Sequence, residues 1–131
     1  MNVLIIGSGG REHALTYKLK QSKEVKKLFT ASGNAGTQKL SQNVDIPPEN
    51  IPEIKKFCIE KKIDLVVVGP ENPLALGIVD SLTKRGIKTF GPNKKATTVE
   101  SSKVFANEFM QRHNIPTADF YIFDELQTTK T

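Results

Sequence analysis

An apolar run at residues 2–6 (NVLII) leads directly into the glycine-rich segment Gly7-Ser8-Gly9-Gly10. Apolar and β-branched residues at consecutive positions indicate a strand covered on both faces, as in a parallel sheet. A second such run, DLVVV at residues 64–68, ends in Gly69-Pro70. Runs of this kind alternate with segments of helical periodicity. The alternation predicts βαβ units and an α/β fold with a doubly wound parallel sheet.

The other predicted elements follow from the same patterns and from glycine and proline stops. Further strands are expected at residues 28–32, 43–46, 87–90 and 118–123, and helices at residues 11–21, 51–62, 74–85 and 96–113. The chain of 131 residues allows one domain of ordinary size and excludes a second full domain.

The balance of charge favours an anionic partner. Lys and Arg outnumber Asp and Glu by 19 to 14, a formal net charge of +5, which fits a phosphate ester or a nucleic acid. Lysine pairs at 26–27, 55–56, 61–62 and 94–95 are scattered along the sequence, so we interpret them as solubilising surface. The expected partner is therefore a small phosphate ester and no nucleic acid.

The single cysteine, Cys58, excludes an intramolecular disulfide framework and suits a reducing compartment. It falls at helical spacing with Ile54 and Phe57, which predicts a buried core thiol; no metal site is predicted around it. The amino terminus is typical of neither a signal peptide nor a membrane span. We therefore expect a cytoplasmic protein with no membrane partner.

The first glycine loop, with Arg11, Glu12 and His13 after it, lies where a strand meets a helix. Glycines let the backbone approach a ligand, and the N–H groups of a helix start attract anions, which predicts a phosphate site. Arg11 either pairs with that phosphate or is solvated. A module that binds NAD or another nucleotide is the alternative, but the G-x-G-x-x-G pattern would need glycine in place of Glu12 and an acid after the second strand.

The second loop, Gly69 to Leu74, follows the DLVVV strand. In the common doubly wound order the first and fourth strands are neighbours, so both loops would face one crevice. Glu71 would then bind the hydroxyls of a sugar phosphate, or would simply be a solvated residue near a helix start. The sequence contains no P-loop, metal-ligand histidine pair or nucleophile elbow, and no catalytic residue is predicted.

Five segments together resemble the amino-terminal part of the glycinamide ribonucleotide synthetase (phosphoribosylamine-glycine ligase) family: VLIIGSGGREHAL, SGNAGT, VVVGPENPLALGIVDSL, FGPNKKAT and ESSKVFANEFMQRHNIPTADF. The resemblance implies a Rossmann-like domain of the pre-ATP-grasp type. It also implies a purine-biosynthesis ligase that joins phosphoribosylamine to glycine with ATP and Mg²⁺ or Mn²⁺. The fragment itself would hold none of these cofactors fully.

The resemblance also assigns residues. It implies that the substrate is bound by three loops, at Gly9, Gly10, Arg11, Glu12, Asn34, Gly36, Glu71, Asn72, Pro73 and Leu74. Lys103 would point toward the ATP phosphates.

Family members continue into an ATP-grasp module. We therefore expect residues 1–116 to form the substrate-binding domain and residues 117–131 to begin the module, so that the chain is an amino-terminal fragment, inactive alone. Its expected partners are the missing module of the same chain and, in this truncated form, a second copy in a homodimer. A nucleic-acid-binding or scaffold protein is a third hypothesis, based on net charge.

Overall fold

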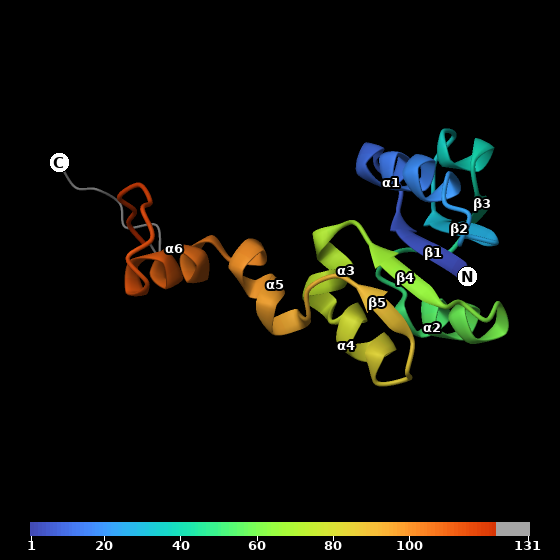
Figure 1. Cartoon of the computed structure of the whole chain (residues 1–131). Coiled ribbons are helices and arrows are strands. Elements are labelled where there is room, and N and C mark those ends of the chain that lie inside the picture. Colours follow the sequence, from blue (N-terminus) through green and yellow to red (C-terminus); the bar gives the residue numbers. More distant parts are fainter. Residues whose placement is uncertain (123–131) are drawn as a thin grey trace. The chain divides into compact units, whose positions relative to one another are not determined.

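The computed structural model describes residues 1–122, and its centre is a parallel sheet of five strands in the order β3-β2-β1-β4-β5 (Figure 1). The strands are β1 (Asn2–Gly7), β2 (Lys27–Ser32), β3 (Gln42–Val44), β4 (Leu65–Val68) and β5 (Lys88–Phe90). All four neighbouring pairs run parallel. The order reverses between β1 and β4, as a doubly wound sheet requires, so the predicted fold class is confirmed.

Helices cover both faces of this sheet (Figure 1). The elements are α1 (Gly10–Lys20), the short η1 (Thr37–Lys39), α2 (Ile51–Glu60), α3 (Glu71–Leu76) and α4 (Ile78–Thr83), followed by α5 (Lys94–Ser101) and α6 (Lys103–Arg112). Helix α1 packs on one face and helices α2, α3 and α4 on the other. Successive residues of β1 point to opposite faces, and residues 3–7 are all buried, which explains the unbroken apolar run.

Two apolar clusters hold the layers together. On the α1 side, Leu15 and Leu19 pack against Val3, Ile5 and Val67. The larger cluster on the other side gathers Leu4, Ile6, Phe29, Ala31, Ile46, Ile54, Cys58, Ile63, Val66, Val68, Leu74, Ile78, Val79 and Leu82. Burial of this kind provides the main stabilising free energy of a small domain.

Two expected helices are each divided. The helix predicted at 74–85 begins earlier and consists of α3 and α4, because Gly77 between them adopts a left-handed conformation with φ of 89°. The helix predicted at 96–113 consists of α5 and α6. Ser102 is extended there and its Oγ accepts a hydrogen bond from the N–H of Phe105 at 3.2 Å. A serine that caps a helix start in this way competes with continuation of the preceding helix.

The predicted strand at 43–46 is shorter in the structure and starts one residue earlier, and η1 was not predicted. Residues 118–122 form no strand, so the prediction at 118–123 is wrong for them, and residue 123 lies outside the described residues.

The chain divides into two compact units, residues 1–97 and 98–131, and α5 runs across the division. In the second unit, Phe105 and Phe109 of α6 stack with ring centroids 6.3 Å apart. The imidazole of His113 lies 4.3 Å from the Phe109 ring. None of the helices formed by residues 1–122 is both long and apolar enough to cross a membrane.

Candidate functional site

Three loops meet the carboxyl edge of the sheet in the first unit. The first glycine loop (residues 7–10) follows β1, and the asparagine loop (residues 33–37) follows β2. The segment here called the Gly-Pro loop (residues 69–74) follows β4 and includes the first residues of α3. Strands β2, β1 and β4 are neighbours and parallel, so their carboxyl ends lie together. This edge, at the reversal of strand order, is where open α/β sheets bind ligands.

Arg11, in the first turn of α1, makes two contacts with the Gly-Pro loop. Its Nη1 donates a hydrogen bond to the carbonyl oxygen of Gly69 at 2.6 Å. Its Nη2 lies 3.9 Å from Oε2 of Glu71, and the two side chains remain 61% and 51% exposed. The structure therefore brings together the arginine and the carboxylate that the sequence placed in one crevice. Both remain open to solvent beside the start of α1.

Glu12 lies at the centre of the arrangement and is only 4% exposed. Its Oε2 accepts a hydrogen bond from the N–H of Gly9 at 2.7 Å. Its Oε1 is buried and has no hydrogen-bond partner among residues 1–122. The side chain reaches from the first turn of α1 back over the first glycine loop, so the carboxylate fixes the shape of that loop.

The position of Glu12 explains why glycine occupies two positions, Gly7 and Gly69. A β-carbon at Gly69 would overlap Oε1 of Glu12, and one at Gly7 would lie 2.7 Å from its Cδ. A side chain at Gly10, in contrast, would meet no atom within 4 Å. Gly7 and Gly69 thus make room for a buried carboxylate, whereas Gly10 faces open space at the start of α1.

Asn34 joins the asparagine loop to the first glycine loop. Its Nδ2 donates to the carbonyl oxygens of Ser8 at 2.9 Å and Gly9 at 3.2 Å. Its Oδ1 accepts from the N–H groups of Gly36 at 2.8 Å and Thr37 at 3.0 Å. These four bonds use the hydrogen-bonding capacity of a terminal amide, so in this structure Asn34 shapes the loops through their backbones.

His13 and Gly36 make a second contact between α1 and the asparagine loop. A β-carbon at Gly36 would lie 2.5 Å from Cε1 of the His13 imidazole. The missing side chain therefore allows the ring to lie directly on the loop. This contact was not predicted, although both residues had been singled out.

The four residues predicted in the Gly-Pro loop differ in burial. Glu71 and Asn72 are exposed, whereas Pro73 and Leu74 are buried. Leu74 is 5% exposed and belongs to the larger core cluster, so its side chain packs in the core. Lys103 is the first residue of α6 and belongs to the second unit.

Cys58 is 2% exposed, which confirms the predicted core thiol. Burial raises its pKa from 9.0 to about 11. Because a reactive cysteine needs a thiolate, this residue is a packing group and takes no part in the site.

A five-stranded parallel sheet with glycine loops and a helix start at its switch point defines a Rossmann-like α/β domain. Residues 1–100 match the family model described as phosphoribosylglycinamide synthetase, N domain. The chain belongs to this family.

Curated relatives agree with this assignment. The chain is 49% identical over 127 residues to phosphoribosylamine-glycine ligase of Caldanaerobacter subterraneus subsp. tengcongensis, with 97% of this chain and 30% of the relative aligned. It is 55% identical over 124 residues to the human trifunctional purine biosynthetic protein adenosine-3, covering 92% of this chain and 12% of that protein. The chain thus spans less than a third of the length of these relatives.

A solved structure shows the same fold. The crystal structure of phosphoribosylamine-glycine ligase from Thermotoga maritima superposes with a TM-score of 0.66 at 28% identity, over 92% of this chain and 27% of that one.

Proposed function

We propose that this chain supplies the phosphoribosylamine-binding part of a phosphoribosylamine-glycine ligase of purine biosynthesis. The observation that carries the proposal is the bridge made by Arg11. A half-exposed guanidinium contacts Gly69 and lies beside a half-exposed carboxylate, Glu71, at the carboxyl edge of the sheet. Such a pair offers one group for a phosphate and one for sugar hydroxyls. The names of the matching relatives favour the same substrate.

The phosphate is expected at the start of α1. The first N–H groups of a helix have no partner within the helix and carry a partial positive charge, and Gly10 leaves open space beside them. Arg11 adds a full positive charge there. Glu71, on the neighbouring loop, accepts hydrogen bonds from the ribose hydroxyls, and the exposed Asn72 lies next to it.

The other predicted binding residues act through the shape of the loops in this proposal. Glu12 holds the N–H of Gly9, and Asn34 holds the carbonyl oxygens of the same loop. Gly36 makes room for His13. The buried side chains of Pro73 and Leu74 anchor the Gly-Pro loop in the core, which holds the neighbouring Glu71 at the edge of the sheet.

A dinucleotide-binding module is the less favoured function. In the dinucleotide fingerprint the third glycine allows close packing of helix and strand. Here Glu12 stands at that position and is buried against Gly69. A buried carboxylate at this point repels a pyrophosphate placed deep in the loop.

ATP and a divalent metal belong to the proposed activity of the whole ligase, with Lys103 directed to the ATP phosphates. Within residues 1–122 no three His, Cys, Asp or Glu side chains are grouped to hold a metal ion. We therefore assign no role in metal binding to these residues. We propose that residues 1–116 form the substrate-binding part. We also propose that the protein is located in the cytoplasm, a reducing compartment that suits the free thiol of Cys58. A homodimer of this chain remains a prediction.

Titration calorimetry with ribose 5-phosphate, a stable analogue of phosphoribosylamine, tests the proposed function. Binding should be tighter than that of NAD, and Arg11→Ala should weaken it by roughly tenfold or more, because a charge-assisted contact to phosphate is lost. Arg85→Ala, at an exposed arginine after α4, is the matched control. A preference for NAD, or equal effects of the two arginine variants, would contradict the proposal.

We further propose that the 131 residues do not catalyse the ligation by themselves. The relatives named as ligases are more than three times as long as the aligned segment. Incubation with phosphoribosylamine, glycine and ATP should give no glycinamide ribonucleotide above background. Detection of that product from the purified chain would disprove this part of the account.

A further inference from the structure

Lysines gather at the amino edge of the sheet, opposite the candidate site. Seven of them line two neighbouring hollows there, namely Lys20, Lys26, Lys27, Lys39, Lys61, Lys62 and Lys88. The pairs at 26–27 and 61–62 are far apart in the sequence and belong to different elements, but in the structure both lie at this edge. Each pair lies just before or at the start of a parallel strand, and the amino ends of parallel strands meet at one edge.

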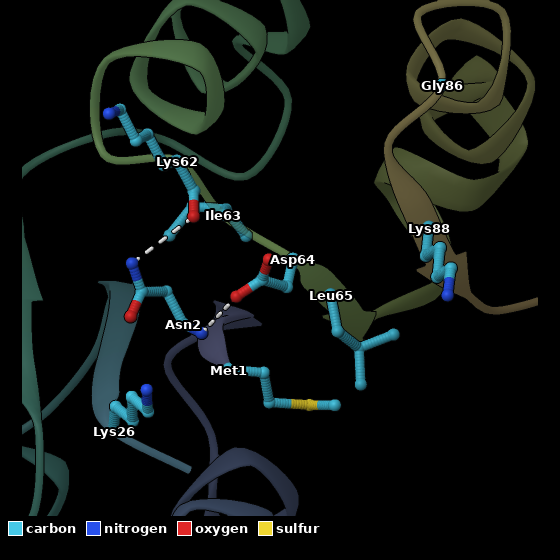
Figure 2. Close-up of a pocket in the computed structure, with 9 residues that line it drawn as sticks. All are labelled: Met1, Asn2, Lys26, Lys62, Ile63, Asp64, Leu65, Gly86 and Lys88. Carbon is cyan, nitrogen blue, oxygen red and sulfur yellow. Dashed lines mark hydrogen bonds between the residues drawn. The ribbon is translucent and has the colours of Figure 1, made fainter. Parts of the chain in front are cut away.

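The first hollow lies at the starts of β1, β4 and β5 (Figure 2). Its volume is about 920 Å³. Lys26, Lys62 and Lys88 surround it, and its other lining residues include Ile63 and Leu65. Its single acid is Asp64, whose Oδ2 accepts a hydrogen bond from the N–H of Asn2 at 2.5 Å. That carboxylate is therefore already used by the backbone.

The second hollow, of about 550 Å³, lies at the starts of β2 and β3. Five lysines line it together with Leu28 and Leu40, and no acidic residue does. Lys26 belongs to both hollows, so the two form one basic surface. All seven lysines are exposed, and none of them has an ion-pair partner in the described part of the chain.

This surface contains the whole excess positive charge of the protein. Seven lysines and one aspartate carry a formal charge of +6, whereas the complete chain carries +5. The remaining residues therefore sum to −1. A basic surface so separated from the ligand site needs an explanation other than attraction of the sugar phosphate, because exposed charges more than about 10 Å apart are largely screened from one another.

We propose that this amino-edge surface binds an acidic polypeptide segment of a partner protein. Lysine side chains are flexible and bind negatively charged groups without requiring planar, bidentate geometry. The half-buried Leu40 and Leu65 between them can contact leucine-like side chains among the partner's acids. Single-stranded nucleic acids are bound instead by exposed aromatic rings and arginines. Both hollows lack arginine, and their one aromatic residue, Phe29, is buried.

The test uses a fluorescently labelled short peptide of alternating glutamate and leucine, and measures its anisotropy with the purified chain. Binding should be detectable at about 20 mM salt and should weaken strongly at about 200 mM, because salt screens exposed charges. The neutral glutamine-leucine peptide should not bind. Lys26→Glu/Lys27→Glu should weaken binding of the acidic peptide by about tenfold or more, because two attractive contacts become repulsive.

The control Lys84→Glu/Lys95→Glu makes the same charge change at exposed lysines outside both hollows and should change the affinity by less than about twofold. Equal effects of the two double variants, or no binding at low salt, would overturn the proposal. So would tighter binding of oligothymidylate than of the peptide. Binding of ribose 5-phosphate should be unchanged in Lys26→Glu/Lys27→Glu, so this proposal and the proposed function can fail separately.

Discussion

At the scale of single residues, Glu12 explains more of the site than its place in the sequence indicated. It is a buried carboxylate that accepts from Gly9 and fills the space beside Gly7 and Gly69. Two glycines from motifs far apart in the sequence are therefore constrained by one side chain. The sequence predicted that β1 and β4 are neighbours, but not their register or the direction of the Glu12 side chain, and this contact depends on both.

Gly69→Ala should destabilise the domain by about 1–3 kcal/mol, the usual cost of overpacking a filled interior. The added methyl group would overlap Oε1 of Glu12. In Glu12→Ala/Gly69→Ala the overlap is removed, so the loss should be smaller than the sum of the two single losses. Chemical denaturation measures all three variants.

Gly10→Ala is the matched control, because a β-carbon there meets no atom within 4 Å. It should raise the free energy of unfolding by no more than about 0.5–1 kcal/mol, since alanine is a better helix former than glycine. Strictly additive losses in Gly69→Ala and Glu12→Ala would show that the two residues do not share this space.

Cys58 should resist alkylation until the domain unfolds. Burial raises its pKa to about 11, so the thiol stays protonated in the folded protein at pH 8. The raised pKa also contributes to the free energy of unfolding below pH 9. This contribution should be lost as the pH rises from 9 to 11, because the thiol of the unfolded chain ionises first. Iodoacetamide labelling measured with and without denaturant, and stability against pH with Cys58→Ala as control, check both statements. Rapid labelling of the native protein would contradict them.

At the scale of elements, the sequence predicted the five strands of the sheet well and the helices less well, and it wrongly predicted a further strand at residues 118–122. The consecutive apolar runs at β1 and β4 are explained by burial of both faces of the sheet. The breaks at Gly77 and Ser102 were missed because a short apolar periodicity continues across them. A left-handed glycine and a serine cap interrupt the helices there without changing which residues are apolar.

Asn34→Ala should loosen the asparagine loop from the first glycine loop. Four hydrogen bonds from one side chain are lost, and an unfolding free energy lower by about 1–3 kcal/mol is expected, because a satisfied amide contributes this much when its partners are left unpaired. Amide hydrogen exchange should accelerate at Gly36 and Thr37. Gln38→Ala, at an exposed amide in η1, should leave both rates unchanged; an equal acceleration would argue against the role assigned to Asn34.

At the scale of the whole molecule, the two edges of the sheet have different character. The carboxyl edge carries Arg11, Glu71 and the helix start, whereas the amino edge carries the excess lysines. Net charge alone could not reveal this separation. The reversal of strand order, expected from the sequence, placed the candidate site at the carboxyl edge. The excess positive charge was expected to attract the sugar phosphate there, but the excess lysines gather at the amino edge.

Mapping of backbone amide chemical shifts during titration with ribose 5-phosphate tests whether the carboxyl edge of the sheet is the sugar-phosphate site. The largest changes are expected at Gly9, Gly10 and Arg11 and in the Gly-Pro loop, with saturation at one molecule per chain. Residues of the amino-edge surface, such as Lys26 and Lys62, should change little. The largest changes at that lysine surface, or no saturable change at the carboxyl edge, would contradict the assignment of this edge as the sugar-phosphate site.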